Sequence, residues 1–120
     1  MTVAGHRTER IAEEIRNEVD LMLAGELKDP RLACVLNVTE VRVPPGMRTV
    51  RVFVQLEGSK EERAEALKGL KAAAGYVRHE LVERLQLRRA PELLFLSDES
   101  EEYGRHIDEL LRKVSGQEKP

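Results

Sequence analysis

The side chains able to do chemistry are few, and their spacing does not favour catalysis. The histidines His6, His79 and His106 stand far from one another and from Cys34, so none matches the spacing of a metal site built from histidine and thiolate ligands. Cys34 lies in an apolar stretch, which favours a buried, inert thiol over a nucleophile. Hydrolase, phosphate-loop and dinucleotide motifs do not occur. We therefore predict no catalytic residue, no metal site, no cofactor and no small-molecule substrate.

Two serines and one acidic run are better explained as the starts of helices than as catalytic or metal-binding groups. Ser59 and Ser100 each precede a helical pattern, where N-cap residues stand. The acidic run over residues 98–102 could hold a hard cation, because carboxylates are the ligands that such ions prefer. Acidic residues are also favourable in the first turn of a helix, and that is the interpretation we prefer.

Basic side chains in the middle of the chain are the best candidates for binding. The formal net charge of the whole chain is −2, but residues 68–89 carry more basic than acidic side chains, whereas the last quarter is acidic. Such a distribution can place a basic footprint on an acidic protein. Aromatic residues are only 3% of the chain, which argues against base stacking as the main binding mode. The basic residues are Lys68, Lys71, Arg78, Arg84, Arg88 and Arg89.

The small residues Ala73, Ala74 and Gly75 interrupt the helical pattern that carries these cations. A glycine inside a helix costs about 1 kcal/mol relative to alanine. Since no proline or turn cluster accompanies it, we predict two helices that meet at a kink. The small residues would let a partner approach the backbone closely, and the second helix would offer N–H groups to an anion. A glycine that merely lets the two helices pack is the alternative.

The first half of the chain predicts a helix followed by a hairpin. Apolar residues recur at helical spacing over residues 7–27, and Pro30 disfavours helix for the residue before it. Residues 32–43 are strand-like, with a change of phase near Thr39 that indicates either a bulge or burial on both faces. A turn at residues 44–47 precedes a strand over residues 49–57.

The second half predicts the kinked helix pair, one strand and a last helix. Ser59 and Glu62 match a capping box at the start of the helix pair. Residues 92–97 form a short apolar strand that should pair with the hairpin, and a weak apolar face follows over residues 107–114. The expected fold class is α+β, with a three-stranded sheet covered by helices on one face. We expect one domain over residues 7–114, a disordered stretch over residues 1–6 and a flexible tail over residues 115–120.

Composition also bears on location. No apolar run approaches the roughly 18 residues of a membrane span. The first residues have no apolar signal segment, and a single cysteine cannot form an internal disulfide. We therefore expect a cytoplasmic protein without membrane contact, and a monomer by default.

The order of several motifs resembles the ribosome-binding factor A family over about residues 7–114. The motifs are RxERIAEEI near the start, KDPR at residues 28–31, the strand over residues 50–56, AAGYVR at residues 73–78 and LQLRRAPELLFL at residues 85–96. The resemblance implies a type II KH-like fold, in which an Ala-x-Gly kink replaces the usual GxxG loop. The slightly acidic net charge departs from a family that is often basic.

The resemblance further implies an assembly factor that binds the free 30S small ribosomal subunit without catalysis. It implies help in maturing the 5′ end of 16S rRNA, notably in the cold. We hypothesise that the cations of residues 68–89 face rRNA phosphates around the Ala73–Gly75 corner. The secondary candidates are Arg7, Arg10, Lys28, Arg31, Arg42, Arg48 and Arg51.

Two alternatives from other functional classes stay open. The first is a protein-interaction adaptor that docks on a ribosomal protein through the hairpin or the first helix, without direct RNA contact. The second is a small phosphate-transfer enzyme, which is disfavoured because no base or nucleophile is positioned for it. Steep salt dependence of binding to naked rRNA would favour the RNA-binding hypothesis.

Overall fold

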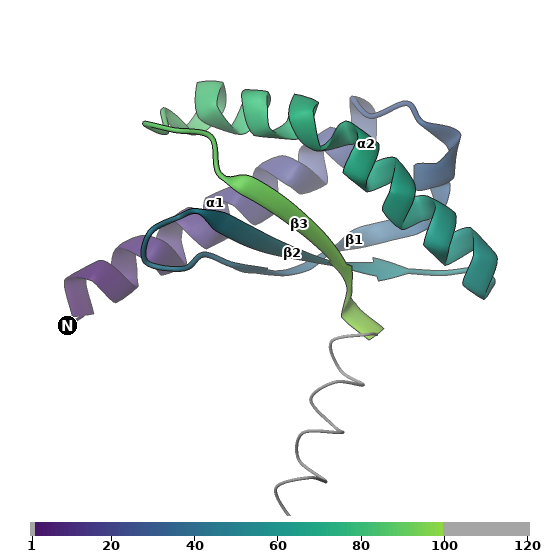
Figure 1. Ribbon diagram of the computed structural model, residues 1–120, viewed down its shortest axis with the longest axis horizontal. Helices are drawn as coiled ribbons and strands as arrows, with labels where there is room; N and C mark the ends of the chain where they lie inside the picture. Colours follow the sequence, from purple (N-terminus) through teal and green to yellow (C-terminus); the bar gives the residue numbers. More distant parts are fainter. Residues whose placement is uncertain (1, 100–120) are drawn as a thin grey trace, which may run out of the picture.

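A computed structural model describes residues 2–99, and it contains two long helices and one sheet (Figure 1). This confirms the predicted α+β class and the three-stranded sheet. The type II KH-like assignment stays a prediction. The elements in order are α1 (Thr2–Gly25), a 3-10 helix (Pro30–Cys34), β1 (Val35–Arg42), β2 (Thr49–Leu56), α2 (Lys60–Leu85) and β3 (Glu92–Ser97).

β2 is the central strand of the sheet, antiparallel to β1 and parallel to β3. The register of β1 shifts twice, between Val35 and Asn37 and between Val38 and Glu40. The second shift lies at Thr39 and favours the bulge, one of the two explanations that the sequence offered for the change of phase. The first makes Leu36 an extra residue that is half exposed, so Leu36 does not share the buried face of Val38 as simple alternation predicts.

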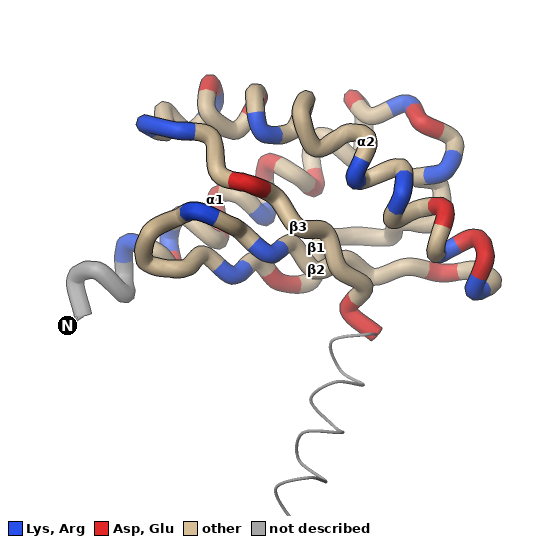
Figure 2. Tube along the Cα trace, viewed as in Figure 1, with Lys and Arg blue, Asp and Glu red and all other residues tan. Residues whose placement is uncertain are grey.

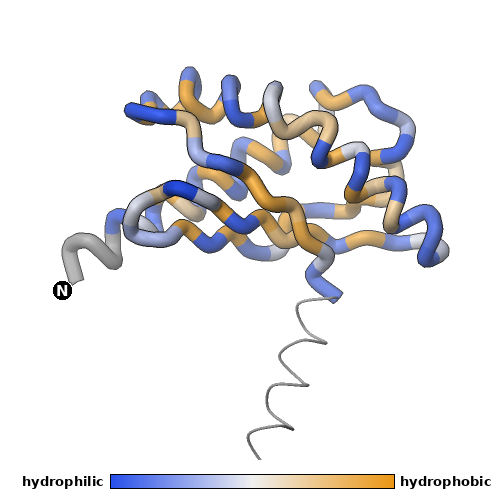
Figure 3. Tube along the Cα trace, viewed as in Figure 1, coloured by the Kyte–Doolittle hydropathy of each residue, from blue (hydrophilic) through white to orange (hydrophobic). Residues whose placement is uncertain are grey.

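Both helices bury their apolar faces against one face of the sheet. The core contains Ile15, Val19 and Met22 from α1, and it contains Leu70, Val77 and Leu81 from α2. These side chains meet Val50, Val52 and Val54 of β2 and Phe95 of β3. Figure 3 shows the hydrophobic segments following the strands, with hydrophilic segments at the turns and helix ends. The helical and alternating periods of the sequence therefore identify the core correctly.

α2 is one unbroken helix, whereas the sequence pattern predicts two helices that meet at a kink. Its ribbon changes direction partway along rather than ending (Figure 1). Without a proline, the helix keeps its backbone bonds through Gly75, and the cost of about 1 kcal/mol for a helical glycine is too small to end it. The predicted capping box is present: Ser59 Oγ accepts from Glu62 N at 3.1 Å, and Glu62 Oε1 accepts from Ser59 N at 2.7 Å.

The ends of the elements differ from those expected. α1 begins at Thr2, whereas the sequence pattern predicts disorder up to residue 6. Residues 30–34 form a 3-10 helix and not the start of a strand, because Asp29 Oδ1 accepts from Arg31 N at 2.9 Å and Pro30 favours a helical first turn. The last helix over residues 107–114 and the tail lie outside the described residues. Within residues 2–99, neither helix is long and apolar enough to cross a membrane.

Candidate nucleic-acid interface

α2 and β3 face each other across a groove of about 270 Å³. Lys68 and Lys71 lie on its α2 wall together with Leu67. Its other wall is β3, an edge strand whose outer backbone groups have no partner strand in the described sheet. The Lys68 ammonium lies 3.1 Å from the Glu65 carboxylate in an exposed pair that holds it only weakly, and Lys71 has no side-chain partner within residues 7–99. This groove can therefore accept an anionic strand.

A second hollow of about 460 Å³ lies next along α2, toward the start of the helix. Leu67 lines both hollows, and Lys60 and Arg63 join the wall in the second. We call the two hollows together the α2–β3 groove. Sequence reasoning did not include Lys60 and Arg63, because the segment around them has more acidic than basic residues. The sequence feature that could have identified Lys60 and Arg63 is their helical spacing to residues 67 and 71, which places all four residues on one face of the helix.

Four exposed arginines gather at one end of the sheet. Arg48 and Arg51 belong to the β1–β2 turn and to β2, and Arg88 and Arg89 belong to the loop between α2 and β3. The turn and the loop meet where Glu92 N donates to Arg48 O at 2.8 Å. Figure 2 shows basic segments on both, at the same end of the molecule. We call Arg48, Arg51, Arg88 and Arg89 the hairpin-end arginines.

The hairpin-end arginines have no side-chain partner within residues 7–99, so their charge is available to a ligand. Arg51 lies opposite Leu94 in the register of β2 and β3, and Leu94 also lines the α2–β3 groove. Because Val50 and Val52 enter the core, Arg51 points to the sheet face that the helices leave open, so it lies beside β3 but not on the α2 side of the sheet. Arg42 lies opposite Arg51 on β1, but it pairs with Glu40 at 2.7 Å and its Cζ lies 5.0 Å from the centre of the Phe53 ring. Arg42 is therefore more restrained than its neighbours.

Arg78 is held by backbone groups of the loop that carries Arg88 and Arg89. Its Nε donates to Pro91 O at 2.8 Å, and its Nη2 donates to Ala90 O at 3.4 Å. The carboxylate of Glu92 lies 3.6 Å from Nη2. The guanidinium is thus a positioning group for the loop.

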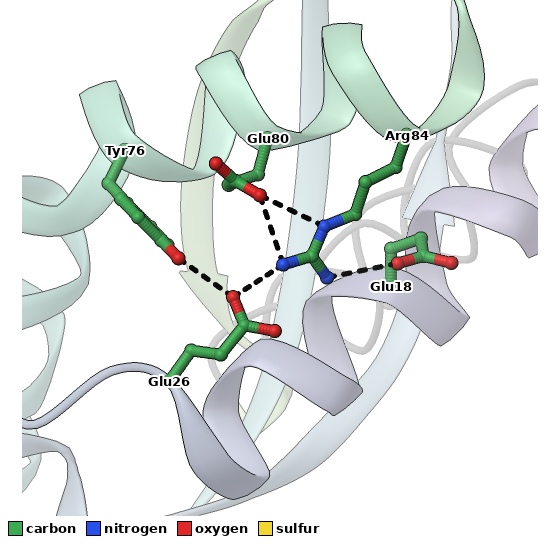
Figure 4. Close-up of polar contacts among 5 residues, drawn as sticks. All are labelled: Glu18, Glu26, Tyr76, Glu80 and Arg84. Atoms are coloured by element: carbon green, nitrogen blue, oxygen red, sulfur yellow. Dashed lines mark hydrogen bonds and ion pairs between the residues drawn. The ribbon is translucent and has the colours of Figure 1, made fainter.

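Arg84 faces α1 and contacts three carboxylates (Figure 4). Its Nε donates to Glu80 at 3.1 Å, its Nη1 to Glu18 at 3.1 Å, and its Nη2 to Glu26. The hydrogen bond from Arg84, and then that from Tyr76 at 2.8 Å, hold the pKa of Glu26 below its ordinary value of 4.5. The same carboxylates raise the pKa of Arg84, with Glu26 the largest cause. Arg84 therefore joins the two helices, and phosphate would have to displace these partners.

The small residues at the bend of α2 have different roles. Ala73 and Ala74 are half-buried against the core. Gly75 is exposed, and a Cβ built there would meet nothing within 4 Å. Gly69 is the glycine that internal packing requires, since a Cβ there would lie 3.1 Å from Leu32 Cδ2. The absence of a side chain at Gly75 is therefore not explained by packing within the described residues.

The remaining secondary candidates do not line the α2–β3 groove. Arg7 and Arg10 are exposed on the first half of α1, and Lys28 is exposed after its end. Arg31 pairs with Asp29 at 2.7 Å, and this pair lowers the pKa of Asp29 through the hydrogen bond from Arg31. Among the described residues, no three histidine, cysteine, aspartate or glutamate side chains gather as a metal site would require.

Comparisons with known proteins agree with one another. The family model of ribosome-binding factor A matches residues 7–111. The ribosome-binding factor A of Acetivibrio thermocellus is 46% identical over 94% of this chain and 92% of its own. The crystal structure of ribosome-binding factor A from Thermus thermophilus matches with a TM-score of 0.65 and 26% identity, covering 75% of this chain and 94% of that one.

A further match is to a homology model of the Thermus thermophilus ribosome binding factor A, fitted into a cryo-EM map of a 30S complex. Its TM-score is 0.52 at 29% identity, with 69% of this chain and 90% of that chain covered. That relative is thus described in contact with a 30S particle.

Proposed function

Because this chain belongs to the ribosome-binding factor A family, we propose that it binds the 30S small ribosomal subunit through the α2–β3 groove and the hairpin-end arginines. The ligand there is the phosphate backbone of 16S rRNA. The protein acts as a non-catalytic assembly factor that assists late maturation of 16S rRNA at its 5′ end, and it matters most in the cold. It works in the cytoplasm as a monomer with a type II KH-like fold.

The observation that carries this proposal is the availability of the cations. Lys71 and the hairpin-end arginines have no side-chain partner within residues 7–99, whereas Arg84 and Arg31 are each bonded to carboxylates. Phosphate contacts by lysine and arginine release counterions, so they supply affinity without reading sequence. This surface can therefore bind rRNA even though the net charge of the chain is −2.

The bend of α2 is the second element of the proposed RNA-binding surface. Since a side chain at Gly75 would meet nothing in the described protein, its absence leaves space for an outside group. A sugar–phosphate chain can then approach the helix backbone closely. The hypothesis from the sequence is kept for Lys68, Lys71, Arg88, Arg89 and the Ala73–Gly75 corner, while Arg78 and Arg84 become positioning residues.

The adaptor hypothesis stays as a second candidate because of one observation. Leu21 on α1 and Leu36 on β1 are large apolar side chains with 59% and 50% of their surface exposed. Exposed apolar residues of this kind can serve a protein contact. They belong to the first helix and the hairpin, the two elements that the sequence suggested for docking on a ribosomal protein.

The test is co-sedimentation of the purified protein with small subunits and with complete ribosomes across a salt series. We expect selective pelleting with free small subunits that fades as salt rises, because phosphate contacts weaken with salt. Binding to small subunits that does not respond to salt would favour the adaptor. Equal pelleting with both particles, or none, would contradict the assembly-factor proposal.

A further inference from the structure

We propose that the acidic segment of this chain, residues 98–102, competes with RNA for the part of the α2–β3 groove nearest the start of α2. The first contact of this competition is present in the structure. Arg63 Nη1 pairs with the Glu99 carboxylate, although the two residues are 36 positions apart in the sequence. Glu99 also lines the groove together with Lys60 and Arg63. The chain thus delivers a carboxylate to the groove wall that would otherwise meet phosphate.

Charge complementarity identifies the occupant as this chain's own segment. Residues 98–102 read DESEE, so all but one of their side chains are acidic. Lys60, Arg63 and Lys68 stand along the facing wall. Lys60 has no side-chain partner within residues 7–99, so a free cation stands on the same wall as Arg63. A row of carboxylates offers these cations the same charge as a phosphate backbone.

Connectivity makes the segment an effective competitor. It follows directly after β3, and Ser97 at the end of that strand is itself part of the groove lining. A short tether of this kind raises the local concentration of a weak ligand to about the millimolar range. An exposed pair such as Arg63–Glu99 is weak by itself, since the Glu99 side chain is 69% exposed. The tether, and not the strength of the pair, therefore sustains the competition.

Occupation of part of the groove by the acidic segment would lower the affinity for RNA without abolishing binding. When the segment occupies its part of the groove, only the remaining fraction of molecules can bind a strand there, and the apparent dissociation constant rises by the inverse of that fraction. Lys71 and the hairpin-end arginines stay accessible to make the first contacts. This part of the inference rests on the proposed function, whereas occupation of the groove by the acidic segment does not.

The experiment compares three full-length proteins: the wild type, E99Q/E101Q/E102Q and the control E14Q/E57Q/E83Q. Both variants remove three negative charges. The control residues are exposed and have no side-chain partner within residues 7–99. Amide NMR spectra at low salt, without RNA, report on the groove. We expect shifts at residues 60, 63 and 67 in the first variant beyond those in the control. Shifts no larger than those of the control would overturn occupation of the groove.

Fluorescence anisotropy with a labelled oligouridine then measures the competition. We expect E99Q/E101Q/E102Q to bind about tenfold more tightly than the wild type, as for a groove masked in about nine molecules of ten. The control should gain clearly less, and the gain should vanish in a K60Q/R63Q background. Equal affinity of the two triple variants would overturn the competition. If none of the proteins binds the RNA, the proposed function fails, and the amide spectra still decide whether the segment occupies the groove.

Discussion

Arg78 Nε donates a hydrogen bond of 2.8 Å to the carbonyl oxygen of Pro91, which fastens the loop after α2 to the last third of that helix. The loop carries Arg88 and Arg89, and β3 begins immediately after it. One side chain thus sets the position of two others. The basic stretch of the sequence is therefore divided into cations that hold the fold and cations that are available to a ligand.

Replacement of Arg78 by methionine should lower both stability and affinity. Two loop carbonyls lose a charged donor, so the free energy of unfolding should fall by about 1–2 kcal/mol. Affinity for the small subunit should fall as well, because Arg88 and Arg89 lose their fixed position. Urea denaturation and sedimentation measure the two effects. Arg78→Lys keeps the charge without the same donor geometry, so wild-type affinity in that variant would contradict a positioning role.

The hairpin-end arginines should account for part of the salt dependence of binding. Replacement of Arg51, Arg88 and Arg89 by glutamine should lower the slope of log affinity against log salt by about 2–3 units, since each phosphate contact contributes roughly 0.7–0.9. The matched control is R7Q/R10Q/K28Q, which removes the same charge from exposed positions outside the groove. A control that lowers the slope as much would show that binding follows net charge and not this surface.

Arg84→Met should destabilise the protein at neutral pH and flatten its response to acid. Glu26 has a lowered pKa in the folded protein, caused first by Arg84 and then by Tyr76. A carboxyl with a lowered pKa contributes stability above its unfolded value near 4.5, and this contribution is lost as the pH falls through the folded value. In the variant, Glu26 loses the cation that lowers its pKa most, so the variant should recover relative to the wild type as Glu26 protonates.

Thermal unfolding of both proteins across the acidic range measures this effect. Arg16→Met is the control, because Arg16 forms an exposed pair with Glu13 inside α1 and joins no second element. It should shift the melting temperature little at any pH. If the difference in melting temperature between the wild type and Arg84→Met stays constant from neutral to acidic pH, the carboxylates around Arg84 do not account for its contribution to stability.

Alanine should stabilise the protein more at Gly75 than at Gly69, the two glycines of α2. Gly75→Ala should raise the free energy of unfolding by about 0.5–1 kcal/mol, because alanine favours helix and its Cβ meets nothing within 4 Å. Gly69→Ala places its Cβ 3.1 Å from Leu32 Cδ2 and 3.3 Å from Arg31 Cβ, so the 3-10 helix must move and part of that gain is lost.

Gly75→Ala should also weaken binding to the small subunit, because the new methyl group occupies the space that we assign to the RNA backbone. Denaturation and sedimentation of the same protein give both quantities. Greater stability together with unchanged affinity would mean that no partner approaches the helix at Gly75. Weaker binding in a more stable protein could not be explained by loss of fold.

The elements and the core could be predicted from the sequence because they follow from local rules. The alternation of residues 49–57, the helical spacing of Val77 and Leu81, and the capping box at Ser59 each rest on residues close together in the chain. The motifs that identify the family are local as well. The bulge near Thr39 was visible as a change of phase, which is also a local property.

Tertiary structure alone decided which cations are available. Arg84 and Lys71 belong to the same basic stretch, yet Arg84 meets Glu18 of α1 and Glu26 just after it, while Lys71 faces a groove. Those carboxylates lie more than fifty residues away, so no spacing rule could find them. Likewise, Gly69 and Gly75 both stand inside the helical pattern of α2, so the sequence does not distinguish them. Only the approach of Leu32 shows that packing requires a glycine at position 69. The charge and the helix propensity of each residue can be read from the sequence. Whether a charge is available to a ligand depends on which distant groups the fold brings beside it.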